Sequence, residues 1–95
     1  MAQYRTQVRI IADVLSTARD MNTEGNGVGI TMLLRRGNLS YARMVKLISE
    51  LVGSGLLEEL SAERVAKYRI STKGIQFLMV YGQFEEFAQS FGLRL

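Results

Sequence analysis

The sequence predicts an α+β fold with three helices, a two-stranded β-hairpin and one further C-terminal helix. Apolar residues recur at helical spacing, Gly-rich breaks separate the helical segments, and residues 65–70 alternate between apolar and polar side chains. The chain of 95 residues is long enough for one modest core and too short for a separate second domain. We therefore expect a single domain over residues 1–95.

The first helix is predicted over residues 6–21, because apolar residues recur there at the spacing of one helix face. These residues are Val8, Ile11, Ala12, Leu15 and Ala18. Residues 22–27 read NTEGNG, and Asn and Gly tolerate the backbone angles that end a helix and reverse the chain. This segment is therefore expected to be a loop.

A short second helix is predicted over residues 29–36, with Ile30, Leu33 and Leu34 facing inward. Gly37 and Asn38 follow it, and both residue types enter left-handed backbone geometry at low cost. The helix is therefore expected to end at this pair, with Gly37 just past its last turn.

Ser40 is a good N-cap for a third helix over residues 41–53, because its hydroxyl can accept from a free backbone N–H. One stripe of this helix is apolar and is expected in the core. It comprises Tyr41, Met44, Ile48 and Leu51, with Val45 and Val52 beside it. The other side is mainly polar, and it comprises Ala42, Arg43, Lys46, Ser49 and Glu50.

Two strand-like runs follow the third helix. Residues 56–60 form the first run, after the break Gly53-Ser54-Gly55, and residues 65–70 alternate as a half-buried strand does. Residues 61–64 separate the two runs. The pattern predicts a β-hairpin with a polar tip.

A last helix is predicted from Lys73 to about Phe91, with Thr72 as its cap. Its aromatic stripe has the four-and-three spacing of a coiled-coil seam, and consists of Phe77, Tyr81, Phe84, Ala88 and Phe91. Another face carries Ile75, Leu78 and Met79, which the domain's own core can use. We therefore expect residues 72–91 to form a dimer interface. The alternative is that the stripe is ordinary core beneath the first helix.

Composition excludes several classes of function. The chain has no Cys and no His, which argues against metal sites, disulfides and the commonest acid–base chemistry near neutral pH. We expect no enzyme activity, cofactor or metal. No apolar run approaches the roughly 20 residues that span a bilayer, and the N-terminus lacks the apolar core of a signal peptide. A soluble protein of the cytoplasm is expected.

The positive charge is concentrated in the middle of the chain. Twelve Lys and Arg residues face nine acids, for a net charge of +3. Residues 28–54 alone carry Arg35, Arg36, Arg43 and Lys46 against Glu50, whereas residues 1–27 are neutral. This distribution is compatible with a polyanionic partner that binds residues 28–54.

In order of elements, the sequence resembles small archaeal winged helix-turn-helix DNA-binding proteins of the ten-kilodalton, chromatin-associated type. The motifs that carry the resemblance are NLSY before the third helix, GLL before the hairpin and YRISTKG into the last helix. The resemblance implies a homodimer joined by antiparallel C-terminal helices. It also implies that the third helix and the hairpin face DNA. The protein would then act as a transcription regulator or as a chromatin protein on the nucleoid.

In such a fold the recognition helix, residues 40–53, enters the major groove and the wing, residues 61–65, contacts the flanking backbone or minor groove. Arg43 and Lys46 are the favoured contacts to base edges or phosphates, and Arg64 is the favoured wing residue. The full predicted set for double-stranded DNA is Arg35, Arg36, Ser40, Ala42, Arg43, Lys46, Ser49, Arg64 and Lys67.

Other interpretations of these residues stay open. Arg35 and Arg36 also suit the carbonyl end of a helix dipole, and Arg43 and Lys46 could be a solvated helix face. The basic residues of the hairpin could pair with its three Glu residues across the strands. The alternative function is a winged-helix adaptor that binds another protein and no DNA.

Overall fold

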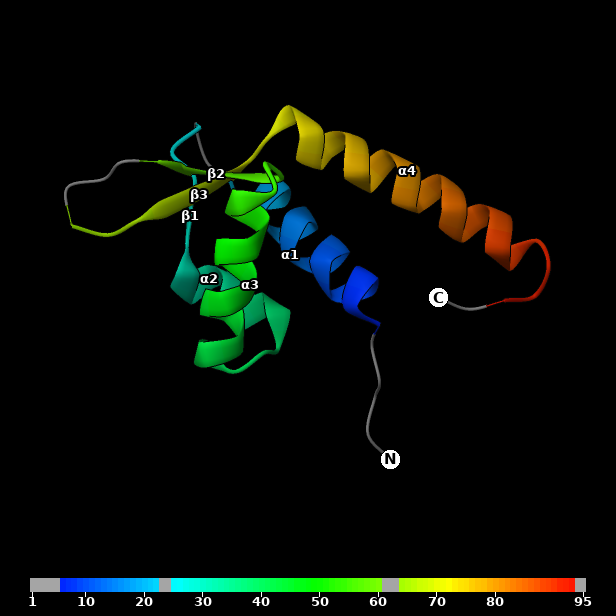
Figure 1. Cartoon of the computed structure of the whole chain (residues 1–95), viewed down its shortest axis with the longest axis horizontal. Coiled ribbons are helices and arrows are strands. Elements are labelled where there is room, and N and C mark those ends of the chain that lie inside the picture. Colours follow the sequence, from blue (N-terminus) through cyan, green and yellow to red (C-terminus); the bar gives the residue numbers. More distant parts are fainter. Residues whose placement is uncertain (1–5, 23–24, 61–63, 94–95) are drawn as a thin grey trace.

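The computed structural model describes residues 6–22, 25–60 and 64–93, and their elements follow the predicted order (Figure 1). The elements are α1 (Gln7–Asp20), β1 (Val28–Gly29), α2 (Ile30–Gly37), α3 (Tyr41–Gly53), β2 (Leu57–Leu60), β3 (Lys67–Ile70) and α4 (Thr72–Gln89). The predicted α+β fold, with its C-terminal helix, is confirmed.

The sheet has one strand more than the sequence predicted. Its order is β1-β3-β2, and both pairings are antiparallel. In the short strand β1, Val28 lies opposite Tyr68 and Gly29 lies opposite Lys67. The predicted two-stranded hairpin is present as β2 and β3. The additional strand β1 was not predicted, because two residues are too few to leave an alternating pattern in the sequence.

Side-chain caps set the starts of α1 and α3. The hydroxyl of Thr6 accepts a 3.1 Å hydrogen bond from the backbone N–H of Arg9. That of Ser40 accepts from Arg43 at 3.3 Å. Each bond satisfies one of the free N–H groups in a first helical turn. The predicted range of the third helix, 41–53, is confirmed at both ends.

The turn between α2 and α3 differs in one detail from the prediction. Gly37 is the last residue of α2, and it is Asn38 that adopts the left-handed conformation, with φ of 55°. Gly37 is buried, and a Cβ there would lie 2.7 Å from the Met44 side chain. The missing side chain thus lets α2 approach α3 closely.

The core lies where α1, α2, α3 and the sheet meet. Its largest fully buried side chains are Val14, Leu15, Leu33, Met44 and Leu57. Leu47, which the predicted stripe did not include, is also buried, whereas Tyr41 and Val45 are exposed. The prediction that Tyr41 and Val45 belong to the core was wrong, because the buried stripe of α3 is centred on Leu47 and Leu51.

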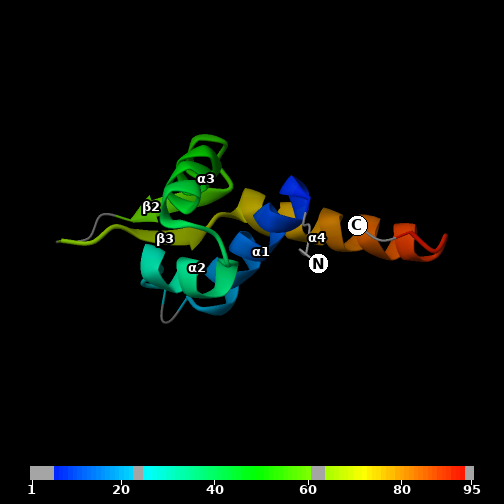
Figure 2. The same cartoon turned by 90° about the horizontal axis from the view of Figure 1, so that it is seen from below.

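The helix α4 extends away from the body of the molecule, at the opposite end from the β2–β3 hairpin (Figure 1). Seen from below, α2 and α3 lie on the two sides of the hairpin and α4 projects beyond both (Figure 2). The molecule therefore measures 48 × 32 × 22 Å along its principal axes. The first half of α4 packs on the core, with Phe77 and Leu78 in contact with it.

Two details of α4 correct the sequence prediction. Its N-cap is Ser71, not Thr72, and the Ser71 hydroxyl accepts from Gly74 N–H at 2.9 Å. Ile75 and Met79 were expected to face the core but are exposed, because α1 packs against another side of α4. Further along, Arg9 of α1 forms a 3.4 Å ion pair with Glu85.

Candidate nucleic-acid interface

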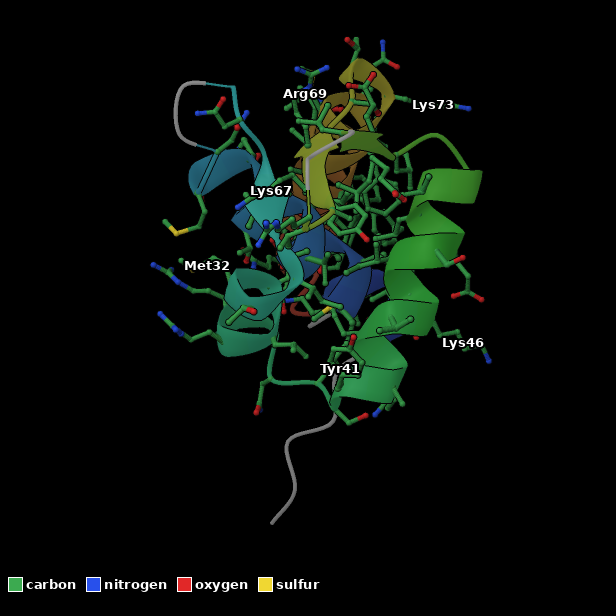
Figure 3. All side chains as sticks on the ribbon, turned by 90° about the vertical axis from the view of Figure 1, so that its left-hand side faces the viewer. Met32, Tyr41, Lys46, Lys67, Arg69 and Lys73 are labelled. Atoms are coloured by element: carbon green, nitrogen blue, oxygen red, sulfur yellow. The ribbon has the colours of Figure 1, made fainter. Side chains whose placement is uncertain are left out.

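The outermost line of α3 is formed by Ala42, Lys46, Ser49 and Gly53. These residues recur at intervals of four, three and four, and all are exposed. Ala42 and Ser49 have small side chains and Gly53 has none, so a second molecule can approach the helix closely along this line. The only long side chain in it is Lys46, which points outward from α3 (Figure 3).

The side of α3 that faces α1 is charged. Arg43 and Lys46 line a groove of about 280 Å³ together with Glu50 of the same helix and Gln7 of α1. Among the described residues, no carboxylate forms an ion pair with Arg43 or Lys46. The structure thus brings these two cations together and leaves both able to contact an anion.

The side of α3 that faces the hairpin is apolar. A groove of about 450 Å³ separates the two elements, and it is lined by Ile30, Tyr41, Val45, Ile48, Ser49, Val52, Glu59, Arg64, Val65, Ala66 and Tyr68. Tyr41 is 63% exposed and Val45 is 42% exposed. We call this the α3–wing groove. The sequence did not predict it, since periodicity alone assigns both residues to the core stripe.

Tyr68 and Glu59 lie opposite each other on β3 and β2 and face the α3–wing groove. Partial burial raises the pKa of Tyr68, and the charge of Glu59 adds to this effect. The Tyr68 hydroxyl therefore remains protonated at neutral pH. The groove thus contains the Tyr68 hydroxyl, which is a hydrogen-bond donor, beside the Glu59 carboxylate. The negative charge of Glu59 disfavours a bound anion there.

The two cations predicted for the wing lie in different places. Arg64 lines the α3–wing groove, as Ser49 of α3 does. Lys67 lines a different pocket, beside β1 and Met21, because successive residues of β3 point to opposite faces of the sheet. Figure 3 shows Lys67 beside the hairpin on its α2 side, whereas Lys46 lies on the outer side of α3. Residues 61–63 of the predicted wing lie outside the described residues.

Arg69, the next cation along the Lys67 side of β3, is held by a carboxylate. Its guanidinium donates to Oε1 of Glu58 on β2 at 2.9 and 3.1 Å. The predicted alternative, in which hairpin cations pair across the strands, is therefore confirmed for this one residue. Arg69 accordingly contributes less free charge to the surface than Arg64 does.

The other predicted contacts lie at the turn between α2 and α3. Arg35 and Arg36 are exposed in the last turn of α2. Hydrogen bonding from Arg19 lowers the pKa of Asp20, and the charge of Arg36 adds a smaller effect. Arg36 is thus close to an acid at the end of α1. The Ser40 hydroxyl is engaged as the cap of α3.

The predicted stripe of α4 is divided between two faces. Ala88 is buried, Phe77 packs on the core, and Tyr81 stacks on Phe77 with ring centroids 6.5 Å apart. Phe84 and Phe91 are exposed as expected. The exposed apolar face is instead formed by Val80, Phe84, Phe87 and Phe91, which again follow four-and-three spacing. Ala88 was predicted to lie in the dimer interface, whereas its side chain is buried within the single chain.

Within the described ranges 6–22, 25–60 and 64–93, no group of acidic side chains could hold a metal ion. In the same ranges, no helix is long and apolar enough to cross a membrane.

Comparison with known proteins relates the chain to a fold family. Its fold is similar to the crystal structure of Sso10a-2, a DNA-binding protein from Sulfolobus solfataricus, with a TM-score of 0.75 and 21% sequence identity over 92% of this chain and 85% of that one. No curated protein matches the sequence. The expected resemblance to small archaeal winged-helix proteins is confirmed. Residues 4–89 match the family model described as winged helix-turn-helix, and the chain belongs to that family.

Proposed function

We propose that this protein binds double-stranded DNA with α3 in the major groove. The observation that carries the proposal is the outer face of α3, where small exposed side chains lie beside two cations, Arg43 and Lys46, that no described carboxylate pairs with. A helix of this kind in a helix-turn-helix unit places its N-terminal residues against base edges. Ala42 and Ser49 allow the close approach.

The wing supplies a second contact in this proposal. Arg64 lies across the α3–wing groove from α3, so it reaches the phosphates that border the major groove or the adjacent minor groove. Arg35 and Lys67 would add phosphate contacts from the two flanks. The structural similarity to a DNA-binding protein from Sulfolobus supports the assignment.

We further propose that the protein acts as a homodimer, joined through the outer face of α4. Val80, Phe84, Phe87 and Phe91 are each more than half exposed, and they form one continuous stripe along the helix. A contiguous apolar surface on a small monomer is costly in water and is typical of an interface. The α3 helices of two copies would then enter successive major grooves about 34 Å apart if the dimer spacing suits.

Such a protein would act on the nucleoid in the cytoplasm, as a transcription regulator or as a general chromatin protein. The concentration of positive charge in residues 28–54 favours a contribution from phosphate neutralisation in either case. The two roles differ in sequence specificity, and footprinting across the genome separates a few sharp sites from scattered occupancy.

The binding experiment is an anisotropy titration of a labelled duplex at several salt concentrations. We expect Arg43→Ala with Lys46→Ala to weaken binding at least tenfold at low salt, and to reduce the salt slope by about one for each phosphate that is no longer neutralised. The matched control is Arg69→Ala, which removes one positive charge that Glu58 already pairs. Unchanged binding by the double variant would contradict the placement of α3 in the groove.

The alternative is a protein-binding adaptor, and the exposed apolar groove next to α3 is the observation that favours it. An adaptor of this kind would not be retained on DNA or heparin resin at low salt. Retention that falls steeply as salt rises supports DNA binding, whereas absence of retention supports the adaptor.

A further inference from the structure

The apolar wall of the α3–wing groove lies outside the buried core. Tyr41 and Val45 lie one helical turn apart and are 63% and 42% exposed. The buried face of α3 is complete without them, since Met44, Leu47, Ile48 and Leu51 supply it. Across the groove, Val65 is 55% exposed. Three large apolar side chains thus face water around one hollow.

The position of this wall matters as much as its exposure. Tyr41 is the first residue of α3 and Val45 lies in its second turn, directly beside Ala42 and Lys46 on the outer line. These are the turns that contact base edges when a helix-turn-helix unit binds DNA. Whatever lies against the outer line of α3 therefore also lies against Tyr41 and Val45.

Charge limits what can occupy the groove. Arg64 lines the groove, and Lys46 lies on the neighbouring, charged side of α3, so an anionic molecule is attracted to this surface as a whole. Inside the groove, however, the Glu59 carboxylate lies next to the Tyr68 hydroxyl and repels an anionic group. The groove is therefore suited to an uncharged apolar group that is carried by a polyanion.

Duplex DNA offers one group of this description. The edges of the bases in the major groove present hydrogen-bond donors and acceptors, and their apolar group is the C5-methyl of thymine. We propose that Tyr41 and Val45, with Val65 opposite them, contact thymine methyl groups and give the protein a preference for thymine-containing sites. This inference rests on the proposed DNA binding and names the base feature that the groove reads.

The test replaces thymine by uracil, which removes the methyl group and leaves the hydrogen-bonding edge of the base unchanged. Duplexes of one sequence are prepared with thymine and with uracil, and the affinity of the full chain for each is measured by anisotropy. Burial of one methyl corresponds to about a fourfold change in affinity, so we expect the uracil duplex to bind about fourfold more weakly for each methyl contacted. In a duplex that carries cytosine at these positions, its replacement by 5-methylcytosine is expected to strengthen binding.

Two variants connect the effect to the groove. Val45→Ser removes the apolar group at an exposed position with little change in helix propensity, and it should reduce the difference between the thymine and uracil duplexes. The control is Val8→Ala, which removes apolar surface from a residue of α1 that is 48% exposed and does not line the groove. This control should keep the full difference.

The outcomes separate the inference from the function on which it rests. Equal affinity of the wild-type chain for both duplexes overturns the methyl contact, while its DNA binding stands. A difference that persists in Val45→Ser together with Tyr41→Ser overturns the assignment to these residues. Absence of binding to either duplex overturns the proposed function itself.

Discussion

Ser71 caps α4 by accepting a 2.9 Å hydrogen bond from the backbone N–H of Gly74, while its own hydroxyl lies 2.6 Å from the carbonyl oxygen of Gly55. The carbonyl oxygen of Leu56 lies 3.0 Å from the same Ser71 hydroxyl. The Ser71 residue is 8% exposed, so these bonds form with little competition from water. One side chain thus joins the segment after α3 to the start of α4.

Ser71→Ala should therefore destabilise the fold by about 1–2 kcal/mol, because it removes an N-cap and the hydrogen bond to the partly buried carbonyl of Gly55. Denaturant unfolding of the full chain measures this change. Thr72→Ala is the matched control, because Thr72 is the adjacent exposed hydroxyl that the sequence favoured as the cap. An equal loss in both variants would contradict the role of Ser71.

Gly74→Ala should destabilise the protein although alanine is the better helix former. A Cβ at this position would overlap the carbonyl oxygen of Leu56 and would lie 2.6 Å from Cγ1 of Ile70. Overpacking of this kind costs about 1–3 kcal/mol, which outweighs the gain of about 1 kcal/mol in helix propensity.

Gly82→Ala is the contrasting variant in the same helix. Nothing lies within 4 Å of a Cβ at position 82, so the propensity gain is not opposed. We expect this variant to be more stable by about 0.5–1 kcal/mol in thermal or denaturant unfolding. Similar effects of alanine at both glycines would show that α4 does not pack against Leu56 as described.

Phe84→Glu should convert the proposed dimer to a monomer, because it places a charge in the centre of the exposed α4 stripe. Light scattering over a range of protein concentrations measures the change. Gln89→Glu is the control, since it adds the same charge to α4 at an exposed position outside the stripe. A wild-type chain that is monomeric at high concentration would refute self-association directly.

Stability at alkaline pH should depend on Tyr68. Because burial raises its pKa above the ordinary value of 10.0, the folded state holds this proton more tightly than the unfolded state does. The resulting stabilisation is present below the unfolded pKa and is lost as the pH rises through the folded pKa. Tyr68→Phe cannot ionise, so we expect it to lose less stability above about pH 10 than the wild type.

The check is urea unfolding of both chains near neutral pH and at alkaline pH. Tyr41→Phe is a suitable control, since Tyr41 is 63% exposed and lies in the same groove. If the wild type and Tyr68→Phe lose stability in parallel as the pH rises, the partly buried Tyr68 hydroxyl does not account for the effect.

The sequence predicted the elements well where a local signal marks them. Both ends of α3 follow from Ser40 at the start and the Gly-rich segment after residue 53. In contrast, Tyr41 and Val45 were grouped with the core stripe but are exposed. The apolar stripe of α3 is wider than the surface that the other elements cover. Periodicity shows which residues share a face, and only tertiary packing decides how much of that face is buried.

The stripe of α4 shows the same limit. Two overlapping sets of residues have four-and-three spacing, one through Tyr81 and Ala88 and the other through Val80 and Phe87. The sequence alone does not choose between them. Packing of α1 against α4 makes the choice, since Ala88 is buried in the structure and Phe87 is 63% exposed.

The two-residue strand β1 has a mechanical consequence. Gly29 is both its last residue and the N-cap of α2, and its partner on β3 is Lys67. The hairpin is therefore joined to the start of α2 directly through β1, and a displacement of the hairpin is passed on to α2. Amide hydrogens of β3 and α2 should consequently exchange as a single cooperative unit. A ligand then binds a surface that is already ordered, so binding does not carry the entropy cost of ordering it.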